Sequence, residues 1–255
     1  MVELKTDAEL ALMRETGRVV AATLAAVREC AAVGVSLREL DAVAAGMIDK
    51  AGATSSFLHY LPHFAPTPYP AVLCTSVNEV IVHGIPDDYR LRDGDLLSAD
   101  FAAELDGFHA DAAFSMIVGT PRPADERLIA HAEQALDAAI AAAVPGNTLG
   151  DIGHAVAVIG RPAGYGIPED FGGHGVGRRM HEDPPVPNEG RPGRGMKLRP
   201  GLVIAIEPMF TAGGKDRYRV KPDGWALYTV DGSRAAHVEH TIAVTENGPV
   251  VLTAP

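Results

Sequence analysis

Apolar residues recur at helical spacing through the first fifty positions of the chain. Thr6 and Glu9 can satisfy each other's free backbone donors as a capping box, and apolar residues then fall three or four positions apart as far as Ala31. A second capping box, from Ser36 to Glu39, precedes another such stripe. Glycine punctuates both segments, at Gly34 and Gly52, so the pattern predicts two consecutive helices that end there.

Continuous apolar and β-branched runs follow a proline-rich segment. Four prolines in residues 61–70 predict a loop. We expect strands over residues 71–77, 80–82, 95–103 and 108–118. Leu105-Asp106-Gly107 would join the last two strands as a hairpin.

The second half of the chain repeats this order of elements. We expect helices over residues 123–144 and from Thr148 to about Ile159, turns and short strands over 160–201, and strands over 202–209 and 237–245. Ala32 to Leu37 and Val144 to Leu149 are similar segments, each before the second helix of its half. We predict an α+β fold of duplicated halves that share one sheet system. However, segments that precede capped helices are often alike, which would explain the similarity of these two segments equally well.

Composition narrows the class of protein. The 255 residues carry a formal net charge of −11, 47% are hydrophobic, and only two are cysteines, Cys30 and Cys74. This profile excludes general disorder and a disulfide scaffold, and it argues against DNA or an anionic membrane as a partner. The charged N-terminus is unlike a signal peptide, and the longest apolar run, Ala138–Val144, is far below the ~20 residues that cross a bilayer. We expect a cytoplasmic protein.

Four carboxylates interrupt otherwise apolar strands: Asp100, Asp111, Glu207 and Glu239. A lone carboxylate in a strand usually faces solvent, but a buried set must be protonated, paired or metal-bound. Asp100 and Asp111 lie on the two arms of the predicted hairpin. Adjacent antiparallel strands are about 5 Å apart, so both carboxylates could point at one cation. Four carboxylates carry −4 and two divalent cations carry +4, so the sequence favours a two-ion site.

Three histidines are candidates to complete such a site. His174 lies within Gly172-Gly173-His174-Gly175-Val176-Gly177, where glycines leave the imidazole uncovered; His181 and His83 are the others. Taken singly, each is more often a turn histidine with an ordinary hydrogen bond than a catalytic or metal-binding residue. The glycine segment lacks the spacing of a phosphate loop, and no H-E-x-x-H or G-x-S-x-G motif occurs.

Five stretches together resemble the type I methionine aminopeptidases, of the pita-bread metallopeptidase superfamily. They are Cys74 to Pro86, Asp100 with Asp111, Gly173 to Glu182, Ile206 to Met209, and Val238 to Thr241. The likeness runs from about Lys5 to Val251. It implies a pita-bread fold, with one catalytic domain over residues 1–255 and an internal pseudo-two-fold around a curved, mostly antiparallel sheet.

The resemblance also implies a metal-dependent removal of N-terminal methionine from peptides and nascent proteins. Its metal ligands would be Asp100, Asp111, His174, Glu207 and Glu239, holding two divalent ions of Co, Mn, Fe or Zn, with a monovalent cation as an additional expectation. Its catalytic residues would be Glu207 as general base, His181 at the carbonyl oxygen and His83 near the scissile amide.

By the same resemblance, a methionine pocket is formed by Phe57, Tyr60, Tyr69, Cys74, Met180 and Trp225, although core packing would also explain these residues. The sequence departs from the family pattern at several neighbouring positions. About six extra residues lie between Tyr60 and Tyr69, and Ser98 and His237 stand where the family usually has Asn and Gln. These changes suggest an altered rate or substrate preference.

Two alternatives remain open at this point. One is a related pita-bread hydrolase, such as an aminopeptidase P or Xaa-Pro dipeptidase, which usually carries a separate N-terminal domain. The other is a non-catalytic pita-bread protein that binds peptides, histones or RNA, and such proteins typically lose metal ligands. We expect a monomer that acts on substrates with a free N-terminus and contacts the ribosome, with no DNA or membrane partner.

Overall fold

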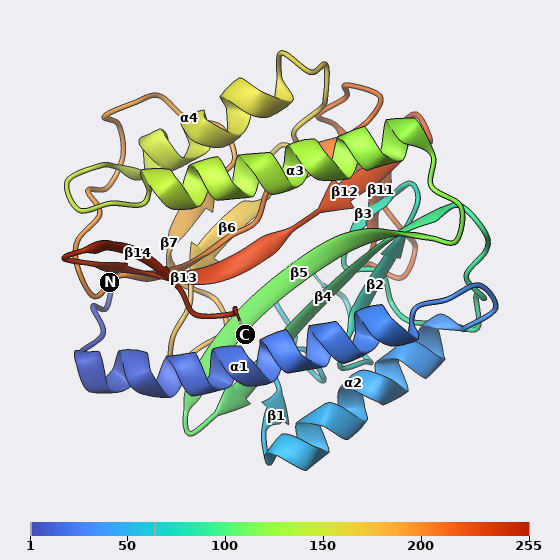
Figure 1. Cartoon of the computed structure of the whole chain (residues 1–255), viewed down its shortest axis with the longest axis horizontal. Coiled ribbons are helices and arrows are strands. Elements are labelled where there is room, and N and C mark those ends of the chain that lie inside the picture. The colour runs from blue at the N-terminus through green and yellow to red at the C-terminus, as the bar shows by residue number, and fades with distance from the viewer. Residues whose placement is uncertain (1, 64, 255) are drawn as a thin grey trace.

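Two helix pairs enclose the strands of this protein. The structure is a computed structural model that describes residues 2–63 and 65–254. Helix α1 (Asp7–Cys30) packs on α2 (Leu37–Ala51), and α3 (Pro123–Ala142) packs on α4 (Leu149–Gly160). In Figure 1 the first pair lies below, and the second above, the central strands. Among the described residues, no helix is both long enough and apolar enough to span a membrane.

Local sequence explains where the first two helices begin and end. Both predicted capping boxes are formed, with the side chains of Thr6 and Ser36 each accepting from the third helical residue. Gly52 ends α2 in the left-handed conformation, at φ 66°, where a residue without a Cβ has no steric penalty. The first helix ends at Cys30, four residues before the expected Gly34.

Within the described residues, nine strands form the main sheet, and each pairing between them is antiparallel. They are β1 (Thr54–Ser55), β2 (Cys74–Val77), β4 (Asp95–Leu105), β5 (Phe108–Val118), β6 (Gly172–Gly175), β7 (Glu182–Pro187), β8 (Val203–Ile206), β13 (Glu239–Thr245) and β14 (Gly248–Val251). Their order is β1-β4-β5-β13-β8-β6-β7, with β2 on β4 and β14 on β13.

Smaller sheets flank the main one. The strands β10 (Tyr218–Val220), β11 (Leu227–Thr229) and β3 (Val80–Val82) form one, and β9 (Met209–Thr211) pairs with β12 (Ala235–His237) in another. The predicted hairpin is present as β4 and β5, joined at Asp106-Gly107. The sequence pattern did not predict the short strands β1, β10, β11 and β14, and residues 71–73 are not strand.

Two predicted strands are each broken into two. Residues 202–209 divide into β8 and β9 around Glu207-Pro208, where proline has no N–H for the ladder. The strand predicted over residues 237–245 divides at Val238, so that His237 ends β12, which pairs with β9, while β13 enters the main sheet. The breaks matter because Glu207 lies at one of them and Glu239 directly follows the other.

The apolar core has one major cluster for each helix pair. One cluster joins α1 and α2 to β4 and β5, and the other joins α3 and α4 to β8 and β13. Each helix pair therefore holds its own part of the sheet, and the strands that carry the candidate residues lie between them. The mixed helices and curled antiparallel sheet confirm the predicted α+β class.

Candidate functional site

Strand register brings three of the candidate carboxylates to one face of the sheet. Asp100 in β4 lies opposite Ala113 in β5, and Glu239 in β13 lies opposite the same Ala113 on its other side. Asp111 precedes Ala113 by two residues and therefore points to the same face. Three side chains from three neighbouring strands thus converge, although Asp111 and Glu239 are far apart in the chain.

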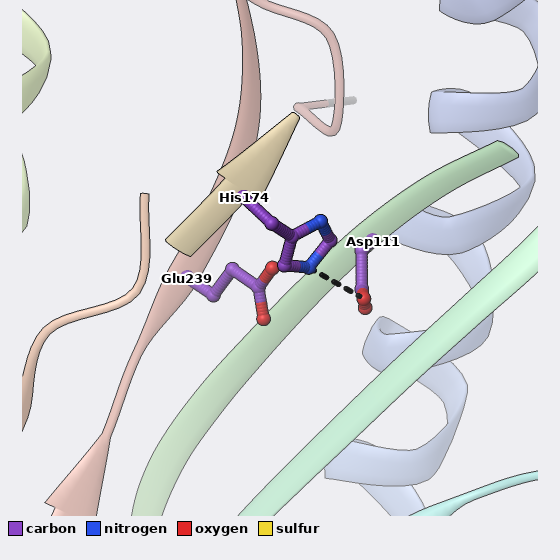
Figure 2. A group of neighbouring side chains, drawn as sticks. All are labelled: Asp111, His174 and Glu239. Carbon is purple, nitrogen blue, oxygen red and sulfur yellow. Dashed lines mark ion pairs between the residues drawn. The ribbon is translucent and has the colours of Figure 1, made fainter. Parts of the chain in front are cut away.

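Glu207, which follows β8, and His174, in β6, reach this group from the second half of the chain. The β8–β13 register pairs Ile206 with His240, which places Glu207 beside Glu239. Figure 2 shows His174, Asp111 and Glu239 pointing toward one another from three strands. His174 Nε2 lies 3.9 Å from Asp111 Oδ2 and 3.7 Å from Glu207 Oε1. The structure therefore brings the five predicted ligand side chains into one neighbourhood.

These carboxylates are buried and only partly satisfied. Asp100, Asp111 and Glu239 are at most 9% exposed, and each has one buried oxygen without a hydrogen-bond partner in the described part of the chain. None of the ion pairs among the described residues joins them to a lysine or arginine. Burial raises the pKa of Asp100, Glu207 and Glu239 well above the usual range, and that of Asp111 to about 7. Such a cluster is stable with its charge only if a cation neutralises it.

The ring of His174 is oriented to offer a lone pair. Its Nδ1 lies 2.9 Å from the carbonyl oxygen of Gly175, to which it donates. Burial lowers the pKa of His174 to about 4, so the ring is neutral and Nε2 faces the carboxylates unprotonated. Asp111, His174 and Glu239 each place a ligand atom within 4.8 Å of the others. This arrangement of one imidazole and several carboxylates fits a divalent transition-metal ion.

A cavity of about 220 Å³ opens onto the cluster. Every residue predicted as ligand, catalytic or pocket residue lines it: Phe57, Tyr60, Tyr69, Cys74, His83, Asp100, Asp111, His174, Met180, His181, Glu207, Trp225 and Glu239. One end is therefore acidic, and the other is aromatic and contains sulfur atoms. Phe57, Tyr69, Cys74, Met180 and Trp225 also pack against one another in one apolar cluster, so they contribute to the core as well as line the cavity.

Hydrogen bonds fix the apolar wall. The Tyr69 hydroxyl lies 3.1 Å from the Leu73 carbonyl oxygen and 2.8 Å from that of Gly84. Its ring packs edge-on against Trp225, with ring centroids 5.0 Å apart. Trp225 Nε1 donates to the Thr67 carbonyl oxygen at 2.9 Å. The extra residues between Tyr60 and Tyr69 are thus attached to the pocket wall.

The two other candidate histidines lie at the junction of the acidic and apolar ends. His181 stacks on Tyr60, with centroids 5.3 Å apart, and its ring lies 4.1 Å from that of His174. His83 has a positive φ of 60°, and its ring contacts those of Phe171 and Trp225. Burial lowers the pKa of His181 to about 2 and that of His83 to about 4, so both rings are neutral.

Sequence reasoning missed part of this cavity. Asp170 and Phe171 also line it, and no local pattern distinguishes them from the surrounding turns. Gly172 lines it as well, at the start of the glycine segment that carries His174. His237 was noted only as a departure from a family pattern, yet its Nε2 lies 3.5 Å from Glu207 Oε2. A histidine two residues before a candidate ligand, in the strand predicted over residues 237–245, was the available signal.

Comparison with known proteins identifies the family to which this chain belongs. Residues 11–246 match metallopeptidase family M24. The chain belongs to metallopeptidase family M24. Membership of this family, together with two clusters of ligand side chains, indicates a divalent metal centre at the acidic end of the cavity.

Relatives within and around the M24 family support the assignment. The chain is 47% identical to methionine aminopeptidase 1 of Mycobacterium tuberculosis, over 99% of this chain and 95% of that protein. The crystal structure of methionine aminopeptidase from Thermotoga maritima is similar with a TM-score of 0.95 and 38% identity, covering 100% of both chains. A prolidase from Pyrococcus furiosus shares the fold at a TM-score of 0.77 and 23% identity, covering 99% of this chain and 65% of that one. The pita-bread fold is thereby confirmed.

Proposed function

We propose that this protein is a metal-dependent aminopeptidase that removes N-terminal methionine from peptides and nascent proteins. The observation that carries the proposal is a single cavity in which a buried acidic cluster adjoins a wall of aromatic and sulfur-containing side chains. Its relatives from Mycobacterium tuberculosis and Thermotoga maritima are named as methionine aminopeptidases, which supports the same activity.

Five side chains would hold two divalent ions: Asp100, Asp111, His174, Glu207 and Glu239. Their four carboxylates carry the −4 that a +4 ion pair balances, and three of them keep a buried oxygen without a partner among the described residues. Cobalt, manganese, iron and zinc are the candidate ions, and a monovalent cation would be an additional structural ion. A bound divalent pair would polarise the scissile carbonyl and lower the pKa of the attacking water.

The protein's own groups would position the substrate and move the proton. Glu207 would accept the proton of the attacking water and pass it to the leaving amine. His181, at the boundary between the two ends of the cavity, would donate to the carbonyl oxygen as negative charge develops there. His83 would hydrogen-bond near the scissile amide, from its position against Phe171 and Trp225.

The apolar wall would select the side chain. Phe57, Tyr60 and Trp225 present ring surface, and Cys74 and Met180 present polarizable sulfur, which suits a thioether. Tyr69 would support the wall from behind, since its hydroxyl is occupied by two carbonyl oxygens. Because the wall closes one end of the cavity, the substrate's free N-terminus would lie at the acidic end.

We further propose that residues 1–255 act as one catalytic domain with an internal pseudo-two-fold. The two helix pairs, each with its own apolar cluster, support that arrangement. A cytoplasmic monomer that meets nascent chains at the ribosome is the setting most consistent with this substrate class.

A peptide panel tests the function. The purified protein, loaded with each candidate metal in turn, is incubated with Met-Ala-Ser, Leu-Ala-Ser and a peptide with proline in the second position. We expect free methionine from the first peptide at a rate at least tenfold above leucine release from the second. Equal rates on all three would refute methionine specificity, and cleavage confined to the proline peptide would favour an aminopeptidase P-like enzyme.

The variant Glu207→Gln provides the control for chemistry. It keeps the size of the side chain but removes the base, so we expect at least a ~100-fold lower kcat. Near wild-type turnover would show that Glu207 is not the general base.

A further inference from the structure

One buried imidazole beside the proposed metal centre has no role so far. His237 ends β12 and is 1% exposed. Its Nε2 lies 3.5 Å from Glu207 Oε2 and 3.7 Å from Glu239 Oε2, and has no hydrogen-bond partner within residues 2–63 and 65–254. A buried nitrogen that faces two carboxylates without a close hydrogen bond requires an explanation.

The separations suit atoms that bind one ion. Two atoms that each bind a metal at about 2.1 Å lie no more than about 4.2 Å apart. Both distances from His237 Nε2 fall below that limit. Glu207, His237 and Glu239 form a ligand cluster of their own, distinct from Asp111, His174 and Glu239, and Glu239 is the residue common to the two clusters.

The backbone of His237 is held in place by a serine of β5, which is not the strand that β12 pairs with. Its N–H donates to the Ser115 hydroxyl at 3.1 Å, and its carbonyl oxygen accepts from the same hydroxyl at 2.8 Å. Ser115 in turn lies 2.7 Å from Ser98, and both serines are buried. The backbone of His237 is therefore fixed beside Glu207 and Glu239 by contacts that do not depend on an ion.

We propose that His237 is a sixth metal ligand, which supplies a second imidazole, beside that of His174, to the proposed two-ion centre. The inference rests on the proposed two-ion centre. It also makes a prediction about the choice of ion. A second nitrogen ligand favours zinc, iron or cobalt over manganese, which prefers oxygen ligands.

X-ray absorption spectroscopy of the zinc-loaded protein tests the proposal directly. Imidazole rings give a distinct scattering signature, so the number of rings per zinc can be counted. With two zinc ions bound, we expect one imidazole per ion in the wild type and half that number in His237→Gln. His240→Gln is the matched control, because His240 neighbours the same ligand but hydrogen-bonds Thr253, at 2.9 Å. This control should leave the count unchanged.

Metal titration provides a second measurement that needs no catalysis. In His237→Gln we expect zinc affinity to fall at least tenfold more than manganese affinity, because the lost ligand is a nitrogen. Thermal unfolding of the metal-free variants reports whether each one is folded. If His237→Gln does not fold, the wild-type imidazole count still decides.

The outcomes separate this inference from the proposed function. Half an imidazole per zinc in the wild type would overturn it and leave His237 as a residue that only positions Glu207 and Glu239. A wild type that binds no divalent ion would overturn the two-ion centre as well. One imidazole per zinc that stays unchanged in His237→Gln would assign the second ring to another histidine, against the proposal.

Discussion

Thr241 connects the metal centre to the sheet, and its replacement by valine should show how that centre is supported. The backbone pairing of β13 with β5 stops at His240 and Ala112. At the next position the Thr241 hydroxyl replaces the backbone as the partner of Asp111. It accepts from the Asp111 N–H at 2.9 Å and donates to the Asp111 carbonyl oxygen at 2.8 Å. Thr241→Val keeps the shape of this fully buried side chain and removes both hydrogen bonds.

The expected cost follows from the two backbone groups that lose their partner. A buried donor or acceptor without a hydrogen bond costs about 1–3 kcal/mol. Both the N–H and the carbonyl of Asp111 would lose their partner and incur this cost. Thr241→Val should therefore lower the free energy of unfolding by about 2–6 kcal/mol. A typical domain has about 5–15 kcal/mol in total. Because Asp111 itself would be less firmly held, zinc affinity should also fall by about 10–100-fold.

Urea unfolding of the metal-free protein measures the first effect, and metal titration measures the second. Thr241→Ser is the matched control, since it keeps the hydroxyl and loses only one methyl group, worth about 1 kcal/mol. A Thr241→Val protein within 0.5 kcal/mol of the wild type would refute the reasoning. So would a serine variant that is no more stable than the valine variant.

Three further predictions concern other parts of the structure. A Cβ at Gly173 would lie 2.0 Å from the Ala205 carbonyl oxygen, so Gly173→Ala should lower the free energy of unfolding by about 1–3 kcal/mol or more. Chemical denaturation measures this loss, and a change below about 0.5 kcal/mol would contradict the close approach. Gly46 is exposed in α2 with open space at its Cβ, so Gly46→Ala should stabilise the protein by about 0.5–1 kcal/mol, and a loss of stability would contradict this. Lys5 pairs with Glu182 at 2.8 Å with both side chains buried, so Lys5→Met should cost about 3–5 kcal/mol by leaving that carboxylate without its cation, and the double variant Lys5→Met, Glu182→Gln should recover stability; a double variant no more stable than Lys5→Met would contradict this cause.

Much of this protein's local structure could be predicted from its sequence. Capping boxes at Thr6 and Ser36 and the left-handed Gly52 depend on neighbours within a few residues, and the helices begin or end there as predicted. The Asp100–Asp111 hairpin is also local, because a tight turn at Asp106-Gly107 fixes which residues face each other.

The candidate residues and their convergence were expected from the sequence, but the strand pairing that brings them together was not. Every residue predicted for the site lines one cavity, and the resemblance to a family, rather than spacing alone, is what selected them. Periodicity extended one strand through Glu207 and another from His237 through Glu239, whereas the structure breaks the chain at Pro208 and at Val238. Those breaks are what bring His237 and Glu207 within 3.5 Å.

Only the tertiary structure decided which carboxylates share a neighbourhood. Asp111 and the Thr241 that supports it are 130 residues apart, and their contact depends on β5 and β13 being neighbours in the sheet. Strand alternation tells which residues share a face of one strand, but it does not tell which strands pair. Helix caps and tight turns are determined by nearby residues, whereas strand order depends on how both helix pairs bury their apolar faces at once, and that balance is set by the whole chain.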